Sequence, residues 1–182
     1  MRKITLIGDS IRQIGYGKKV PEILGDEYEV FQPNDNCRFA KYTLLGIEMW
    51  GSDMAGSDVI HWNNGLWDTC DRYGDGAFSK KEEYVDNMLR IAKLLMKITP
   101  NLIFATTTPC RKGHKNQKNE VIDEYNAALV PELKKLGVKI NDLNALIRGH
   151  EDEYICDDLI HLSEKGIDIC ANKVVELIKS FE

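Results

Sequence analysis

Apolar and β-branched residues gather in five short runs along the chain, each bounded by polar residues, glycine or proline. Runs of this kind are typical of strands that are buried in a sheet. They cover residues 4–7, 28–31, 59–62, 102–106 and 138–140. The pattern therefore predicts five strands.

Between these runs, apolar residues recur at the 3.6-residue period of an amphipathic helix. The clearest stretch begins near Ser79, which is followed three residues later by Glu82, and it ends at Pro100. That spacing is typical of a capping box, in which the serine and the glutamate satisfy the first free N–H groups of the helix. A final helix is expected to begin near Ser163.

A further helical stretch follows residue 120 and contains a proline. Its apolar stripe includes Val121, Tyr125 and Leu129, and Pro131 falls inside it. Because proline has no N–H to donate and crowds the preceding turn, we expect a kink or a break at that position. Gly137 is expected to end the stretch.

Strands that alternate with helices predict a parallel sheet with helices on both faces, that is, an α/β fold of three layers. No repeat or linker interrupts the alternation, so residues 1–182 are expected to form one domain. Two stretches remain without periodicity, at about 67–78 and 109–118. Ligands of such folds bind beyond the carboxyl ends of the strands, where these stretches are expected to lie.

The charge composition of the chain excludes some classes of binding partner. The 182 residues include 24 basic and 29 acidic side chains, a net charge of −5, which argues against nucleic acid or an anionic membrane as the main partner. We find neither a signal peptide nor an apolar stretch of membrane-spanning length, so a cytoplasmic location is expected.

The number and spacing of the cysteines also favour a cytoplasmic location. The five cysteines are odd in number and none forms a C-x-x-C pair, so we predict reduced thiols and no metal site. They are Cys37, Cys70, Cys110, Cys156 and Cys170.

Candidate chemistry lies at two distant points of the chain. The first strand runs into Gly8-Asp9-Ser10, and Asp158 stands three residues before His161. Ser10 has a simpler interpretation as a helix cap, and His161 as a surface side chain beside a solvated carboxylate. A serine nucleophile nevertheless needs a base, and a histidine held by a carboxylate is such a base. Asp157 is a rival partner for His161.

Asparagines follow two of the predicted strands. Asn63 and Asn64 come after the third strand, and Asn34 and Asn36 come after the second. Asparagine is common in turns, which is one interpretation. An amide aimed into the site would instead stabilise an oxyanion in a transition state.

In their order along the chain, these residues resemble the SGNH, or GDSL-type, serine hydrolases. Gly8-Asp9-Ser10-Ile11 is similar to the first block of that family, with Ser10 in the place of the nucleophile, and Asp158 to His161 is similar to the last. The resemblance spans residues 8–161. It implies a flavodoxin-like fold with five parallel strands and an esterase or acyl-hydrolase site that needs no cofactor.

The two middle blocks match less closely. The third, usually G-x-N-D, aligns with residues 61–64 and implies that Asn63 is the oxyanion asparagine, although His61 replaces its glycine and Asn64 its aspartate. The second block normally supplies a glycine N–H. Asn36 is the best match for it, through its backbone N–H, and Cys37 is the alternative.

We therefore expect a serine esterase that cleaves a small, soluble ester, with deacetylation of a carbohydrate preferred. Trp67 and Tyr73, in the 67–78 stretch, are candidates for substrate contact because aromatic faces suit sugar rings or acyl chains. His114 is interpreted as a solvated loop residue, with a place near an anionic substrate as the alternative.

A lysophospholipase or thioesterase is the alternative function within the enzyme class. A non-catalytic flavodoxin-like module that binds FMN or a phosphate is the alternative outside it. A homo-oligomer is left open.

Overall fold

The computed structural model describes residues 1–182, and its five strands form one parallel sheet. The strand order is β2-β1-β3-β4-β5. The strands are β1 (Arg2–Gly8), β2 (Tyr28–Phe31), β3 (Val59–Asn63), β4 (Leu102–Ala105) and β5 (Lys139–Asn141). All five lie within two residues of the runs predicted from the apolar pattern, and the predicted fold class is confirmed.

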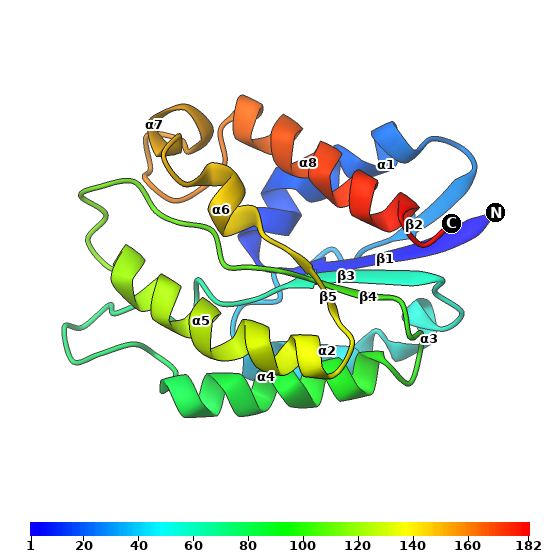
Figure 1. The fold of residues 1–182 in the computed structure, drawn as a ribbon, viewed down its shortest axis with the longest axis horizontal. Helices are drawn as coiled ribbons and strands as arrows, with labels where there is room; N and C mark the ends of the chain where they lie inside the picture. The colour runs from blue at the N-terminus through cyan, green and yellow to red at the C-terminus, as the bar shows by residue number, and fades with distance from the viewer.

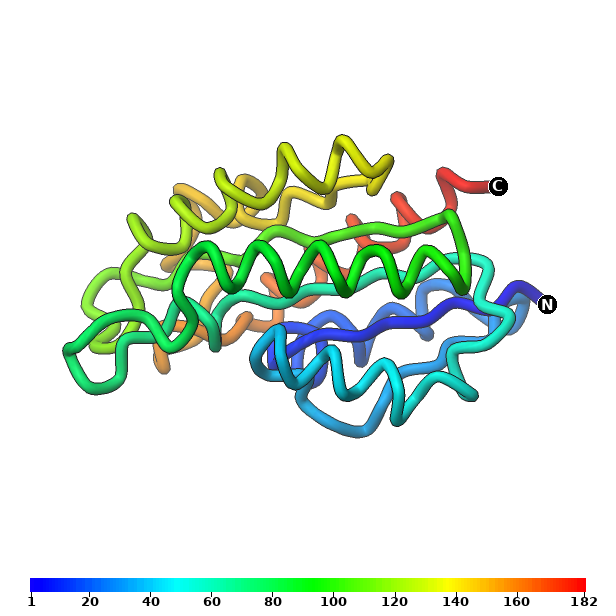
Figure 2. Tube along the Cα trace, turned by 90° about the horizontal axis from the view of Figure 1, so that it is seen from below, coloured from blue at the N-terminus to red at the C-terminus, as the bar shows by residue number.

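Helices cover both faces of the sheet, as Figure 1 shows. One face carries the π-helix η1 (Ile11–Gly15), the 3₁₀ helix η2 (Tyr16–Lys18), α1 (Val20–Leu24), α6 (Leu143–Ile147), α7 (Glu151–Tyr154) and α8 (Glu164–Lys179). The other carries α2 (Ala40–Met49), α3 (Gly51–Met54), α4 (Lys81–Leu95) and α5 (Asn119–Lys135). Figure 2 shows α4 lying between α2 and α5 across that face. None of the helices combines the length and the apolar composition that a bilayer-spanning segment needs.

Strands β1 to β4 each contribute to two hydrophobic cores because their side chains alternate between the faces of the sheet. In β1, Ile4 and Leu6 pack toward α8, whereas Ile7 packs into the core under α2, α4 and α5. Trp62 of β3 is fully buried in the second core and packs against Phe104 of β4.

One local prediction is wrong, and of the kink or break expected at Pro131 the break does not occur. Helix α4 begins at Lys81, and Ser79 makes no capping bond, because its hydroxyl donates to the buried Asp68 carboxylate (2.6 Å). Helix α5 runs unbroken through Pro131. Leu129 and Leu133 are fully buried on either side of the proline, and we attribute the continuity of the helix to this anchoring on the sheet.

The two stretches without periodicity contain no helix or strand, as expected. They follow β3 and β4 at the carboxyl end of the sheet, and they are joined there by hydrogen bonds. The Asp71 N–H donates to the Asn116 carbonyl (2.9 Å), and Thr69 Oγ1 donates to Gln117 Oε1 (3.0 Å). The loop after β3 and the loop after β4 therefore act as two connected walls above the sheet.

Candidate active site

A continuous chain of hydrogen bonds joins three of the predicted site residues. Ser10 Oγ lies 3.0 Å from His161 Nε2, and His161 Nδ1 lies 2.7 Å from Asp158 Oδ2. Ser10 stands where β1 passes into η1, and the other two stand on a turn between α7 and α8. The fold thus brings together groups that are 151 residues apart in the sequence. This arrangement can move a proton from a hydroxyl to an imidazole that a carboxylate orients.

The turn at residues 156–161 is built so that Asp158 faces His161. Asp158 Oδ1 accepts from the backbone N–H groups of Ile160 (3.0 Å) and His161 (2.9 Å), which leaves Oδ2 for the imidazole. Partial burial alone would raise the pKa of Asp158, but these hydrogen bonds outweigh it and the pKa lies below its usual value. Asp158 is therefore ionised at neutral pH.

The rival carboxylate, Asp157, points elsewhere. Its side chain is fully exposed and lies 3.2 Å from Arg111 Nη1. Because adjacent residues on this turn point in different directions, only the carboxylate three residues before His161 reaches the ring.

Asn63 is placed beside the β1 turn by the register of the sheet. Gly8 pairs with Asn63 across β1 and β3, and a Cβ on Gly8 would fall 1.9 Å from Asn63 Oδ1, so only glycine fits there. The Asn63 amide is held at both ends. Its oxygen accepts from the Tyr16 hydroxyl (2.8 Å), and its nitrogen donates to the buried Asp9 carboxylate (2.7 Å). One N–H of the amide remains for another acceptor.

The side chain of Asn64, the alternative to Asn63, forms hydrogen bonds at both ends with residues that lie outside the candidate site. Its nitrogen donates to the Arg38 carbonyl (2.8 Å), and its oxygen accepts from the Thr43 hydroxyl (3.0 Å). Neither partner belongs to the segment that carries Ser10. The geometry therefore favours Asn63 of the two.

The backbone donors expected after β2 are engaged in other hydrogen bonds. The Asn36 N–H donates to Asp35 Oδ1 (2.7 Å), and the Cys37 N–H donates to the Gly8 carbonyl (3.1 Å). The expectation that the Asn36 backbone N–H faces the site is therefore not met in this conformation, because a neighbouring carboxylate competes for it. The side chain of Asn36 does border the same pocket as Ser10.

A buried polar network lies beneath Asn63. The Tyr16 hydroxyl, which donates to Asn63, lies 3.4 Å from His61 Nδ1, and His61 Nε2 lies 3.1 Å from Asn141 Nδ2. These contacts fit a neutral His61 that carries its proton on Nδ1 and accepts from Asn141. Complete burial lowers the pKa of His61 to about 3, and a proton on Nε2 would also oppose the Asn141 amide.

This network predicts acid lability with a defined origin. In the unfolded chain His61 takes up a proton below pH 6.5, whereas in the folded protein it stays neutral until about pH 3. Its contribution to stability is complete above pH 6.5 and is lost as the pH falls toward 3. Between pH 7 and pH 4 we expect the free energy of unfolding of the wild type to fall by about 3 kcal/mol more than that of His61→Gln.

Urea denaturation of both proteins at the two pH values measures that difference. Burial raises the pKa of Asp68 to about 6, which acts in the opposite sense, because the folded state is then stabilised as the pH falls from 6 toward 4. Both proteins contain Asp68, so its effect cancels in the comparison. Equal losses of stability in the two proteins would contradict the prediction.

Ser10 and His161 border a pocket of about 340 Å³ between the two loops. Leu66, Trp67 and Phe78 form an apolar wall, and His114, Asn116 and Gln117 form a polar one. The predicted contact residue Trp67 lines this pocket. Tyr73 does not: its side chain is 77% exposed and packs edge-on against Phe78 outside the cavity.

Of the lining residues that were not singled out from the sequence as substrate contacts, four carry a charged, amide or aromatic side chain. They are Arg72, Phe78, Asn116 and Gln117. His114, interpreted as a solvated loop residue, also borders the pocket, and partial burial lowers its pKa. All five lie in the two stretches without periodicity, and that position was the only signal available for them. No periodicity marks which loop side chains turn inward.

Solved structures with the same architecture are known. An acetyl xylan esterase, AlAXEase, superimposes with a TM-score of 0.82 at 19% identity, covering 97% of this chain and 99% of that one. A lipase/acylhydrolase from Enterococcus faecalis gives a TM-score of 0.78 at 19% identity, with 99% and 96% covered. The chain has the fold of the GDSL-type lipases and acylhydrolases. An acetylxylan esterase from Geobacillus stearothermophilus, at 15% identity and a TM-score of 0.75, shares this GDSL-type fold over 97% of the chain and 94% of its own. No protein-family model and no curated protein matches the sequence.

Proposed function

We propose that this protein is a serine esterase that removes a small acyl group, most simply acetyl, from a hydroxyl of a carbohydrate. The observation that carries the proposal is the hydrogen-bonded chain from Ser10 through His161 to Asp158, which opens onto a pocket. A GDSL-type fold and a pocket at the carboxyl end of its sheet support it. In this reaction Ser10 is the nucleophile, His161 the general base and Asp158 the residue that orients the imidazole.

The first half of the reaction transfers the acyl group to Ser10. Its Oγ attacks the ester carbonyl carbon while His161 Nε2 takes the hydroxyl proton. Asp158 accepts from Nδ1–H and stabilises the imidazolium that results. The tetrahedral intermediate then collapses, and His161 returns the proton to the departing alcohol oxygen. In the second half water repeats the attack with the same base, and Ser10 regains its proton as the acid leaves.

We assign three donors to the oxyanion. The Ser10 backbone N–H has no acceptor in the protein, and the Asn63 amide keeps one N–H beyond the one it gives to Asp9. The third is the Asn36 side-chain amide, whose oxygen is held by the Arg38 N–H (2.9 Å) and whose nitrogen remains to donate. This replaces the backbone donor expected at Asn36 with a side-chain donor from the same residue.

A carbohydrate fits the pocket on two grounds. Trp67 and Phe78 offer aromatic surface for the apolar face of a sugar ring, while Asn116 and Gln117 offer amides to its hydroxyls. The volume of about 340 Å³ lies near the lower end of the roughly 300–1,000 Å³ usual for ligand sites, which suits a small substrate. Acetyl xylan esterases are among the proteins that share the fold.

The substrate class is tested with a panel of esters at equal concentration. We expect acetate release from acetylated xylan and from peracetylated xylose, and p-nitrophenyl acetate to be cleaved at least about tenfold faster than p-nitrophenyl octanoate. A preference for octanoate or for lysophosphatidylcholine would instead support a lysophospholipase or thioesterase. Failure to cleave any of these esters, with FMN absorbance in the purified protein, would support the binding module.

The oxyanion assignment predicts that Asn63→Ala lowers kcat by roughly 10²–10³ while KM changes little, because the amide acts only in the transition state. Asn64→Ala is the matched control. It is expected to lower the melting temperature, through its lost bonds to Arg38 and Thr43, more than it lowers kcat. Steady-state kinetics with p-nitrophenyl acetate measure both variants. If Asn64→Ala has the larger loss of kcat, the two residues have been assigned in the wrong order.

A further inference from the structure

Arg111 connects the loop after β4 to the turn that carries Asp158 and His161. Its backbone N–H donates to the Leu159 carbonyl (2.9 Å), inside that turn. Its guanidinium contacts the first residues of the turn and the residues just before it, through both Nε and Nη1. These contacts are Nε to Asp152 Oδ1 (3.0 Å), and Nη1 to Asp157 Oδ1 (3.2 Å) and to the carbonyls of Cys156 (3.4 Å) and Ile155 (3.5 Å).

The turn that Arg111 contacts holds an unfavourable backbone conformation. Leu159 has a φ of +71°, in the left-handed region, where a side chain with a Cβ crowds the following carbonyl. Within the turn, Cys156 and His161 are joined by a hydrogen bond (2.7 Å), and the Leu159 N–H donates to the Cys156 carbonyl (2.9 Å). Because Leu159 follows Asp158 and stands two residues before His161, a change in its φ moves those two side chains relative to each other.

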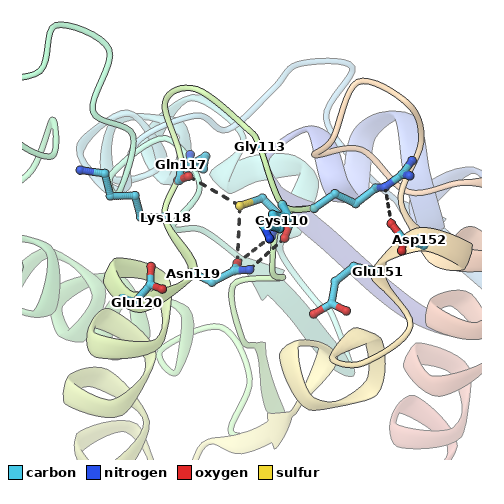
Figure 3. A pocket seen from close by; sticks show the side chains of 10 residues that line it. Cys110, Gly113, Gln117, Lys118, Asn119, Glu120, Glu151 and Asp152 are labelled. Carbon is cyan, nitrogen blue, oxygen red and sulfur yellow. Dashed lines mark hydrogen bonds and ion pairs between the residues drawn. The ribbon is translucent and has the colours of Figure 1, made fainter.

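Arg111 itself is fixed from the opposite side. The residue before it, Cys110, is bound twice by the Asn119 side chain at the start of α5, through Cys110 N–H to Oδ1 and Nδ2 to the Cys110 carbonyl, both 2.9 Å. Figure 3 shows this pair on one wall of a second pocket, with Glu151 and Asp152 across from it. Arg111 thus links the start of α5, through Cys110, to the 156–161 turn.

The contacts of Arg111 differ in strength because their partners differ in exposure to solvent. Asp152 and Asp157 are solvated, with side chains 93% and 107% exposed, so their ion pairs are strongly screened. The Arg111 side chain is only 22% exposed, and its bonds to the Ile155 and Cys156 carbonyls act on the backbone itself.

We propose that Arg111 is a positioning residue that holds the 156–161 turn in its left-handed conformation, so that His161 stays within reach of Ser10. The catalytic part of this inference rests on the proposed function of Ser10 and His161. The conformational part stands on the contacts alone. Because the loop that carries Arg111 also supplies His114, Asn116 and Gln117 to the pocket, the same residue couples the pocket wall to the turn.

The first test compares Arg111→Ala, Arg111→Lys and Arg148→Ala with the wild type. Arg148 is the control: it also pairs with exposed carboxylates, Asp123 and Glu151, but contacts no residue of the turn. The rate of Ser10 labelling by a fluorophosphonate probe is expected to fall by about 10²-fold in Arg111→Ala, since small displacements of reacting groups cost this much. Arg111→Lys keeps the charge but lacks the planar guanidinium, so its labelling rate should fall less. In Arg148→Ala the labelling rate should fall by less than about twofold. A labelling rate in Arg111→Ala equal to that in Arg148→Ala would overturn the proposal.

The second test does not depend on activity. Hydrogen exchange is measured at the amides of Leu159, Ile160 and His161, which all donate within the turn. We expect exchange at least about tenfold faster in Arg111→Ala than in Arg148→Ala. If the wild type cleaves no ester and is not labelled but this difference is found, the proposed function fails and the conformational role of Arg111 stands. Equal protection in the two variants would refute that role.

A second substitution separates positioning from a merely structural contribution. Asparagine tolerates the left-handed region better than leucine, so Leu159→Asn lowers the cost that Arg111 offsets. In a Leu159→Asn background the labelling loss caused by Arg111→Ala should shrink about tenfold. An undiminished loss would mean that Arg111 acts on something other than this conformation.

Discussion

Replacement of Ser10 by alanine is expected to abolish ester hydrolysis and leave the fold unchanged. The Ser10 hydroxyl lies 3.0 Å from His161 Nε2 and is the only group of the chain with which that nitrogen forms a hydrogen bond. Without it no acyl-enzyme can form, and kcat should fall by a factor on the order of 10⁶. The side chain is half-buried and makes no capping bond to η1, so the melting temperature should move by only a few degrees.

Labelling with a fluorophosphonate probe gives the same prediction without a known substrate. The wild type should be labelled and Ser10→Ala should not, because the probe reacts only with an activated serine. Ser52→Ala, which removes an exposed hydroxyl on α3, is the matched control and should be labelled like the wild type. Hydrolysis retained in Ser10→Ala would refute the mechanism. An unlabelled, well-folded wild type would favour the binding module.

The second large effect is expected from Asp158→Asn. The asparagine oxygen can still accept from the Ile160 and His161 N–H groups, so the turn should persist. Its NH₂, however, would face His161 Nδ1 and favour the imidazole tautomer that carries its proton on Nε2. That nitrogen could no longer accept the Ser10 proton, and kcat should fall by about 10⁴.

Steady-state kinetics of Asp158→Asn beside Asp123→Asn measure this effect. Asp123 is an exposed carboxylate that pairs with Arg148 and does not line the Ser10 pocket, so its variant should keep full activity. A tenfold loss or less in Asp158→Asn, with the turn intact by hydrogen exchange, would show that the carboxylate does not control the tautomer.

The sheet was predictable because burial on both faces leaves a clear apolar run in the central strands β1, β3 and β4, and the edge strands β2 and β5 are less buried but keep a run of the same kind. The helix details were less so, because tertiary contacts decided them. Ser79 binds Asp68 instead of capping α4, and the burial of Leu129 and Leu133 accompanies an α5 that stays continuous through Pro131. Asp68 lies 11 residues before Ser79, and the core that buries Leu129 and Leu133 is formed largely by other elements, so a local pattern reveals neither contact.

In the candidate site, too, some residues could be predicted from the sequence and others could not. Ser10, Asp158 and His161 follow structural boundaries that the pattern locates, and the structure brings them together, although their catalytic roles remain predictions. The direction of a loop side chain has no such signal. Tyr73 faces solvent and His114 faces the pocket, the reverse of what their residue types indicated. The Asn36 N–H is likewise engaged by Asp35, its immediate neighbour.

The bonded pair of loops above the sheet has a consequence for how new specificities can arise. The proposed nucleophile and base lie outside both loops, whereas most side chains that line the pocket lie within them. Insertions and exchanges in residues 66–78 and 112–118 can therefore alter which ester is accepted without touching the reacting groups. Arg111 marks the limit of this freedom. A transplanted loop that lacked it would bring a new pocket wall and, on our proposal, loosen the turn that holds the base.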